Sequence, residues 1–529
     1  MLDVHTDRTA DGDDAATAHV RIAIAGAGFA GLGLAIRLRE AGIEDFVVFD
    51  RAAEIGGTWQ ANTYPGCQCD VPSHLYSFSF APNPDWSRTY SLQPEIWDYL
   101  RRCSEHHELA SHLRLGHELT GAAWDDAAQQ WRVQTSRGEL TAQILVDATG
   151  PLSHPAVPRI RGLQRFEGAV FHSAAWHHDH DLRGERVAVI GTGASAIQFV
   201  PRIQPQVGRL HLFQRTAPWV MPHSDRPITP WERRLYRTLP LAQRLVRGAV
   251  YCMRELIAIG MTRDQRLLRP LQRIGRAHLR RSVRDPALRR KLEPQFSLGC
   301  KRILVSNDYY PALTQPNVEL VTDAIEHIDG RAIVTRDGRS REVDTILLGT
   351  GFHVTDPPTA ALIRGRNGKT LFECATGEGG IQAYLGATFA GFPNLFKLIG
   401  PNTGLGHSSM IYMIESQIAY VLDALRVMDE RAITSLDVRP QAAAAHNDRL
   451  QARMARTVLG VGLRELVPGR LGAQHDAVAR LHLSLPPPPA ALRSTRLRAA
   501  QRRARRAAGA MRRGGEFDSA GRTVFITVH

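Results

Sequence analysis

The chain of 529 residues has few cysteines, no long apolar run and no basic, apolar leader. Without a run of about 18 apolar residues, we expect no membrane-spanning helix. The first residues are acidic and polar, so a secretory signal is not expected either. The six cysteines form neither a CxxC pair nor a zinc-binding spacing. This pattern favours a reduced, cytoplasmic chain without a metal site.

The composition is that of a folded protein, because 43% of the residues are hydrophobic. The length corresponds to about three structural units. The formal net charge is +14, but residues 460–529 hold thirteen arginines against four acidic residues, a net of +9. Only +5 is left for the rest of the chain, so the charge does not indicate a nucleic-acid partner.

A first nucleotide site is indicated near the start of the chain. Residues 20–31 read VRIAIAGAGFAG, an apolar strand followed by a glycine turn, and an apolar helical pattern comes next. A second strand, residues 46–50, ends in an acid that can accept hydrogen bonds from ribose hydroxyls. The helix N-terminus offers free N–H groups to a pyrophosphate. The residues expected here are Gly26, Gly28, Phe29, Ala30, Gly31 and Asp50.

A second nucleotide site is indicated by residues 186–198, RVAVIGTGASAIQ. The following strand ends at Arg215, where an NAD site usually carries an acid. A guanidinium suits a 2′-phosphate, so we expect NADPH; the alternative is that Arg215 is a solvated charge. The residues expected here are Gly191, Thr192, Gly193, Ala194, Ser195, Ala196 and Arg215.

Two such motifs in one chain predict an α/β fold with two Rossmann-like dinucleotide-binding domains and a helical insertion. One nucleotide is then a fixed flavin and the other a hydride donor. Strand-like runs at 144–150 and 345–352 agree with this plan. Disulfide reductases share it, but Cys67 and Cys69 are too close together for their redox pair.

The chain is expected to divide into four parts. We predict an FAD-binding domain made of two segments, with an NADPH-binding domain between them in sequence. A disordered leader precedes these domains, and an atypical tail follows them. The boundaries are 1–18 for the leader, 19–150 and 385–458 for the FAD domain, 151–384 for the NADPH domain with a helical insert at about 225–298, and 459–529 for the tail.

Residues 166–177, FEGAVFHSAAWH, resemble the FxGxxxHxxxW signature of the flavin-dependent Baeyer–Villiger monooxygenases. The matching residues are Phe166, Gly168, His172 and Trp176, whereas His177 stands where that family has Pro or Asp. The related N- and S-oxidising flavin monooxygenases usually carry Phe or Tyr in place of Trp176. The string therefore favours ketone oxidation and leaves heteroatom oxidation as the alternative.

Three further strings, at 56–70, 299–313 and 400–417, extend the resemblance over about residues 20–458. The resemblance implies an FAD- and NADPH-dependent monooxygenase. Such an enzyme uses a flavin C4a-peroxide to insert one oxygen of O₂ beside the carbonyl of a ketone or aldehyde, which gives an ester or lactone.

By the same resemblance, Arg302 is the catalytic cation beside the flavin, and it also meets the nicotinamide. Asp70 orients Arg302, and Lys301 joins Arg215 and Thr216 at the 2′-phosphate. His172 is expected to organise the junction between the domains. Further residues expected at the flavin are Gly57, Thr58, Trp59, Asp70, Tyr76 and Met410.

The tail differs in character from the rest of the chain, being rich in Arg and Pro without a clear period. Members of the resembling family carry segments similar to SGCGSWYLD and NTTLWPGFTF near this point. Shifting the codons of residues 465–469 and 474–483 by one nucleotide permits SWYLD and NTTLWPGFTF. We interpret residues from about Val458 onward as a frameshifted, disordered translation. A catalytically impaired relic that binds both cofactors is therefore a further alternative.

The frameshift hypothesis predicts a missing or extra base in the gene. Resequencing across codons 455–470 tests it, and an unbroken reading frame in that region would remove the idea.

Overall fold

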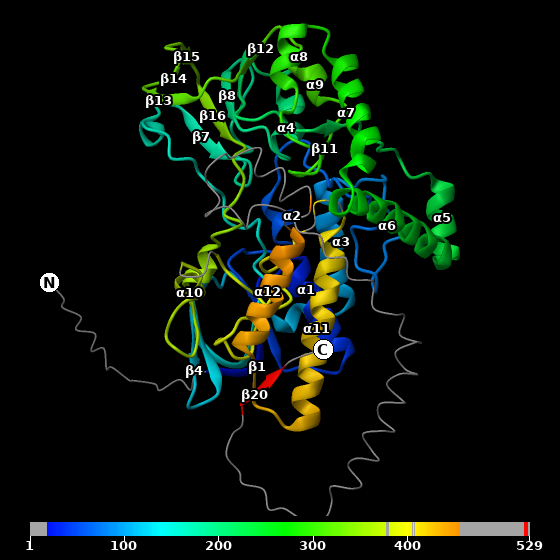
Figure 1. The fold of residues 1–529 in the computed structure, drawn as a ribbon, viewed down its shortest axis with the longest axis vertical. Coiled ribbons are helices and arrows are strands. Elements are labelled where there is room, and N and C mark those ends of the chain that lie inside the picture. The colour runs from blue at the N-terminus through cyan, green and yellow to red at the C-terminus, as the bar shows by residue number, and fades with distance from the viewer. Residues whose placement is uncertain are drawn as a thin grey trace, which may run out of the picture.

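The structure is a computed structural model that describes residues 18–376, 380–404, 406, 408–454, 457 and 523–526. It consists of two α/β units, one above the other in Figure 1, with a group of helices at one side. The predictions for the leader and for most of the tail lie outside the described residues.

The first unit is built around β1 (Ala18–Ala25), the strand predicted before the first glycine turn. It pairs in parallel with β2 (Phe46–Asp50) and β6 (Gly138–Asp147), as the apolar runs at these positions predict. The sheet continues from β2 to β3 and from β6 through an antiparallel meander. The further strands are β3 (Leu113–Leu115), β4 (Leu119–Asp125), β5 (Gln130–Thr135), β17 (Ile363–Arg364) and β18 (Leu395–Lys397).

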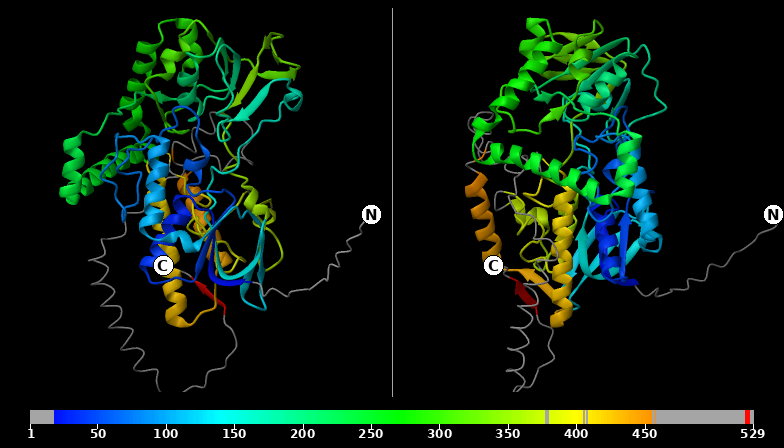
Figure 2. Two further views of the ribbon diagram at one scale, coloured as in Figure 1. Left: turned by 180° about the vertical axis from the view of Figure 1, so that it is seen from behind. Right: turned by 90° about the vertical axis from the view of Figure 1, so that its right-hand side faces the viewer.

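Helix α1 (Phe29–Glu40) follows the first glycine turn and is apolar on nearly every side, so it is buried between the sheet and α11 (Met410–Arg431). Figure 2 shows α11, in yellow, running alongside the blue N-terminal elements. The remaining elements of this unit are α2 (Thr58–Ala61), α3 (Gln93–His106), η1 (Leu109–His112), η4 (Pro358–Ala361), α10 (Leu371–Thr376), β19 (Ser435–Val438), α12 (Pro440–Met454) and β20 (Thr523–Ile526).

The second unit holds a five-stranded, fully parallel sheet in the order β12-β9-β8-β16-β7. Its strands are short, apolar and buried on both faces, which is typical of parallel sheets covered by helices. The elements are η2 (Leu163–Arg165), β7 (Ala169–His172), β8 (Arg186–Ile190), α4 (Ala196–Ile203), β9 (Arg209–Phe213), β10 (Val220–Met221), β11 (Leu304–Val305), α9 (Tyr309–Leu313), β12 (Val318–Val321), β13 (Ile325–Asp329), β14 (Ala332–Thr335), β15 (Ser340–Glu342) and β16 (Thr345–Leu348).

The helical insert predicted at about 225–298 is present. It consists of α5 (Pro230–Thr238), α6 (Pro240–Thr262), η3 (Gln265–Leu268), α7 (Arg269–Ser282) and α8 (Pro286–Leu292). Helices α5, α6 and α7 lie along one side of the molecule, at the right of Figure 1. Across the described residues, no helix combines the length and the apolar character needed to cross a bilayer.

Two boundaries differ from the prediction. Strand β17 pairs with β4, so the chain re-enters the first sheet at Ile363 and not at residue 385. This strand has two residues, too few to give a periodic signal in the sequence. Strand β20 lies within the tail that we expected to be disordered, yet it pairs in parallel with β19.

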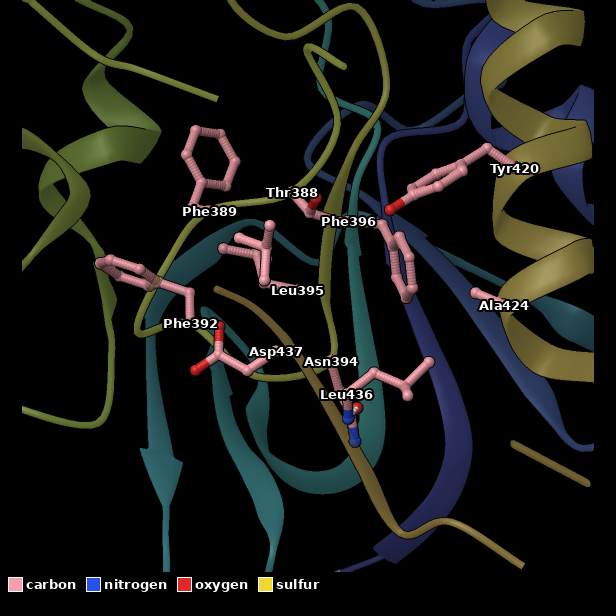
Figure 3. Close-up of a pocket in the computed structure, with 11 residues that line it drawn as sticks. Thr388, Phe389, Phe392, Asn394, Leu395, Phe396, Tyr420, Ala424, Leu436 and Asp437 are labelled. Atoms are coloured by element: carbon pink, nitrogen blue, oxygen red, sulfur yellow. Dashed lines mark hydrogen bonds between the residues drawn. The ribbon is translucent and has the colours of Figure 1, made fainter. Parts of the chain in front are cut away.

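A small cavity lies in the first unit between β18, α11 and β19. In Figure 3, Tyr420 and Ala424 of α11 face it from one side and Phe389, Phe392 and Leu395 from the other. Burial raises the pKa of Asp437 in its wall to about 6. None of the predicted site residues lines this cavity, so it is separate from the candidate site.

A buried ion pair secures the strand ends beside the first glycine turn. Lys397 Nζ donates to Asp147 Oδ2, and both side chains are nearly inaccessible. Thr149 Oγ1 donates to the other carboxylate oxygen at 2.6 Å. Burial alone would raise the pKa of Asp147, but the charge of Lys397 outweighs it and holds that pKa below its ordinary value.

We predict that Lys397→Met lowers the free energy of unfolding by about 3–5 kcal/mol, because it leaves a buried carboxylate unpaired. The stability that the ion pair gives to wild type is full above the ordinary Asp pKa of about 3.9. It is lost as the pH falls through the lowered pKa of Asp147. Thermal melts across pH measure this, with the exposed Lys369→Met as the matched control. Equal melting temperatures for the two variants would contradict it.

Candidate active site

The first glycine turn has the geometry of a phosphate cradle. Gly26 has a φ of +112°, and a Cβ on Gly31 would lie 1.8 Å from the Gly26 carbonyl oxygen, so the turn and α1 are in direct contact. The backbones of Gly28 and Gly57 also approach closely, since a Cβ on Gly57 would lie 3.0 Å from the Gly28 Cα. No side chain caps the N-terminus of α1. Its N–H groups therefore fit a pyrophosphate.

Asp50 at the end of β2 holds the turn itself. Its Oδ2 accepts from the Ala27 N–H at 2.7 Å, and its Oδ1 accepts from the Ala52 N–H at 2.9 Å. Each carboxylate oxygen has a further lone pair, so a ribose contact remains compatible with these bonds. The ribose contact is predicted from the sequence, whereas the two backbone bonds are not.

Three of the expected flavin residues form one aromatic wall. Trp59 Nε1 donates to Tyr76 Oη at 3.0 Å, and the two rings meet edge to face at 5.5 Å. The Phe29 ring lies 5.3 Å from Tyr76 in the same manner. Thr58 opens α2 beside Gly57, and Met410 opens α11. An apolar wall next to the phosphate cradle fits a flavin ring.

The second glycine turn leads from β8 to α4. Gly191 has a φ of +111°, and Ala196 is buried where α4 packs against the sheet. Gly193 and Ala194 are exposed, and no side chain caps α4 at Ser195. Thr192 Oγ1 donates to the Thr216 carbonyl at 3.2 Å, which joins the turn to the end of the next strand. This turn also fits a pyrophosphate.

Two cations lie at the expected 2′-phosphate position. Burial lowers the pKa of Lys301, and the positive charge of Arg215 lowers it further, so the two groups are close neighbours. Both side chains are exposed, and neither forms an ion pair with an acid in the described part of the chain. An exposed lysine and arginine whose charges act on each other, with no acid paired to either among the described residues, fit a phosphate dianion.

Asp70 and Arg302 form a bidentate ion pair across the two units. Arg302 Nε donates to Asp70 Oδ2 at 2.7 Å, and its Nη2 donates to Oδ1 at 2.5 Å. Burial alone would raise the pKa of Asp70, but Arg302 outweighs it and holds that pKa below the ordinary value. Asp70 in turn raises the pKa of Arg302. Both groups therefore stay charged at neutral pH.

The ion pair lies beside the aromatic wall. Burial raises the pKa of the Tyr76 hydroxyl, and the charges of both Asp70 and Arg302 act on it. The Arg302 side chain keeps 41% of its surface accessible, so the ion pair does not seal it off. The predicted catalytic pair and the predicted flavin wall are thus brought together.

Gln198 of α4 joins the two units, a role that the sequence analysis did not identify. Its Oε1 accepts from Tyr64 Oη at 3.0 Å and from the Gln68 N–H at 3.2 Å, while its Nε2 donates to the Gln68 carbonyl at 2.9 Å. A lone glutamine on a helix gives no signal in sequence. Through Gln198, α4 is bonded to the segment that ends at Asp70.

The FxGxxxHxxxW string lies at the junction of the units. A Cβ on Gly168 would lie 2.1 Å from the Asp344 carbonyl oxygen, so the residue must be small. His172 Nδ1 accepts from the Ala174 N–H at 3.1 Å, and burial lowers its pKa, which keeps the ring neutral. The ring also packs 5.5 Å from Phe352. This geometry suits an organising residue.

Trp176 and its neighbours pack on α4. The Trp176 ring lies 5.5 Å from Phe199, which in turn lies 6.0 Å from Tyr64. Phe166 belongs to the partly buried apolar edge of the second sheet. His177, the departure from the signature, stacks on Phe171 at 4.7 Å, so the substitution is accommodated by packing.

The cysteines near the site do not form a redox pair. Cys67 and Cys69 are buried free thiols, and burial raises the pKa of Cys67 to about 12. Such a thiol is protonated at neutral pH and is a poor nucleophile. The geometry therefore defines a two-domain, dinucleotide-binding oxidoreductase without disulfide chemistry.

Comparisons with known proteins agree with this class. The family described as Pyridine nucleotide-disulphide oxidoreductase matches residues 23–244. The chain is 53% identical to a Baeyer-Villiger monooxygenase of Streptomyces coelicolor over 84% of its own length and 85% of that relative. It is 49% identical to a Baeyer-Villiger monooxygenase of Pseudomonas aeruginosa over 85% of each chain.

Solved structures give the same result. A steroid monooxygenase bound to NADP matches with a TM-score of 0.75 and 32% identity, covering 83% of this chain and 92% of that one. A cyclohexanone monooxygenase from Rhodococcus sp. Phi1, bound to NADP⁺, matches with a TM-score of 0.76 and 28% identity over 88% and 94% of the two chains. The chain belongs to the Baeyer–Villiger monooxygenase family.

We predict that Arg215→Ala raises the KM for NADPH by about tenfold to a hundredfold, since it removes a charge-assisted contact to the 2′-phosphate. The KM for NADH, which lacks that phosphate, should stay unchanged. Steady-state kinetics with both nucleotides measure this, and Arg336→Ala on the β14–β15 turn is the control. A parallel loss with both nucleotides would show that Arg215 does not recognise the phosphate.

Proposed function

We propose that the protein oxidises a small ketone or aldehyde to an ester or lactone, with FAD in the first unit and NADPH in the second. One oxygen of O₂ enters the C–C bond beside the carbonyl, which for an aldehyde gives a formate ester. The other leaves as water with two electrons from NADPH and two protons, one of them from solvent. The observation that carries this proposal is the Asp70–Arg302 ion pair beside the flavin wall, on the side where the second unit meets the first.

Bound FAD, once reduced by NADPH, supplies the activation of O₂. The chain binds it through the glycine turn at residues 26–31, the strand-end acid Asp50 and the wall of Phe29, Trp59 and Tyr76. The turn at residues 191–196 binds the pyrophosphate of NADPH. Arg215, Thr216 and Lys301 hold the 2′-phosphate.

Arg302 supplies a fixed positive charge where negative charge develops on the reacting oxygens. Its raised pKa keeps it protonated throughout the working range, so it donates hydrogen bonds and does not exchange protons. Nε and Nη2 are engaged with Asp70, which leaves Nη1 to face the substrate. Asp70 acts on the reaction through the orientation of Arg302.

The identity of the relatives and of residue 176 favours ketone oxidation over the alternatives. Relatives at 53% and 49% identity carry the Baeyer-Villiger name. Trp176 stands where N- and S-oxidising relatives of the fold usually have Phe or Tyr. An impaired relic is the second candidate because we interpret the tail as a frameshifted segment. It predicts bound flavin but NADPH oxidation that no ketone stimulates.

The cytoplasm is the proposed location. None of the six cysteines, all of which lie among the described residues, is joined in a disulfide, as expected in a reducing compartment. The proposed reaction also consumes NADPH, which that compartment supplies.

We predict that Arg302→Ala still binds FAD but loses ester formation by at least about a hundredfold, because a charge at the reacting oxygen is removed. Flavin absorbance and product analysis by gas chromatography with a panel of small ketones measure the two properties separately. Arg302→Lys should recover little, since an ammonium cannot form the bidentate contact. An Arg302→Ala variant with wild-type ester formation would show that another residue carries this role.

A further inference from the structure

Helix α6 is fixed to the body of the protein by polar bonds, and Val246, Val250 and Tyr251 of the same helix pack against the core. Gln243 is 5% exposed, and its Nε2 donates to the Asn83 carbonyl at 2.6 Å. The partly buried Arg247 donates through Nη1 to the carbonyl oxygens of His74 at 2.8 Å and Ser77 at 2.9 Å. These bonds fix the rotation of the helix, so the orientation of its faces is not an accident of loose packing.

The outward side of α6 is also largely apolar, and it faces solvent. The exposed residues recur every three or four positions, several of them as adjacent pairs, so they lie along one face of the helix. They are Leu241, Arg244, Leu245, Gly248, Ala249, Cys252, Met253 and Leu256. Leu245 is 66% exposed and Leu256 is 68% exposed. We call this row the outer stripe. A helix normally buries its apolar side, so the outer stripe indicates that something covers it.

The exposed apolar side chains are concentrated in the insert that contains this stripe. Thirteen large hydrophobic residues are exposed in the described chain, and eight of them lie in the insert. Trp231 of α5, at 69% exposure, and Leu239 at the α5–α6 corner belong to the same insert. Such a concentration differs from the scattered exposure of a monomeric surface.

The insert is also strongly basic. Residues 225–298 hold eighteen Lys or Arg and six Asp or Glu, a net of +12. The net charge of the insert exceeds the +5 of the whole chain before the tail, because the residues before the tail that lie outside the insert are acidic overall. Helix α7 exposes arginines at positions 269, 273, 276 and 280, which lie on one face at helical spacing. Figure 1 shows α7 on the same side of the molecule as α5 and α6.

We propose that α5, α6 and α7 dock on the surface of an anionic lipid bilayer, with the outer stripe among the headgroups and acyl chain ends and the arginines at the phosphates. An apolar row beside a basic row is the pattern of a helix that lies in the interface plane. A second copy of this chain is disfavoured as the occupant, because two inserts that each carry a net charge of +12 would repel each other. Nucleic acid would use the arginines but not the apolar stripe.

Cys252 gives a direct probe, because it lies in the outer stripe and the other five cysteines are buried or partly buried. The flavin-loaded full chain is labelled there with an environment-sensitive fluorophore. It is mixed with vesicles of phosphatidylcholine alone or of phosphatidylcholine with about one third phosphatidylglycerol. We expect sedimentation with the anionic vesicles and a blue shift of the label.

The variant Leu245→Glu/Leu256→Glu tests the stripe, and Val157→Glu/Phe372→Glu changes two exposed apolar residues outside the insert as the matched control. Both retain the tail, so its arginines are the same in each. We expect at least a tenfold loss of vesicle binding in the first variant and less than a twofold change in the second. Ketone turnover without vesicles should stay the same in both, which separates docking from catalysis.

Three results would overturn the proposal. The first is equal vesicle binding by wild type and Leu245→Glu/Leu256→Glu. The second is sedimentation with the vesicles without a spectral change of the label at Cys252, since the lipid contact would then lie elsewhere, for example on the tail. The third is lipid-free self-association that the stripe variant abolishes, which makes the stripe an interface between copies of this chain.

Discussion

The ion pair between Asp70 and Arg302 is the interaction on which the chemistry of the site depends. A guanidinium alone would be free to turn towards solvent or either nucleotide. The two hydrogen bonds that Arg302 donates to one carboxylate fix the plane of its guanidinium. Because Asp70 belongs to the first unit and Arg302 to the second, the correct position of the cation also requires the units to be correctly docked.

Polar bonds around the same segment secure that docking. Gln198 connects α4 to Tyr64 and Gln68, a few residues before Asp70. Asp225, from the start of the insert, accepts from Gln68 Nε2 at 2.9 Å and from Arg88 Nε at 2.7 Å. A polar junction of this kind allows small adjustments between units more readily than an apolar one would. The catalytic pair thus lies where both units contribute to its position.

The local features of this fold are readable from sequence, whereas the contacts between distant segments are not. Apolar runs before Gly26 and Gly191 predict β1 and β8 because a buried parallel strand is apolar on both faces. The two-residue strand β17 and the bonds of Gln198 depend on partners far away in the chain. Periodicity predicted the helices of the insert, but it could not say that α6 leaves a row of apolar residues exposed.

The site unites two dinucleotide cradles, an aromatic wall and one oriented cation. We propose that one atom of O₂ enters the product beside this cation. Labelled oxygen tests it most directly: the purified enzyme is given NADPH, a small cyclic ketone and ¹⁸O₂ in unlabelled water. The account predicts a lactone carrying one ¹⁸O atom in the ring. A lactone without the label, or NADPH consumption that yields no lactone at all, would contradict it.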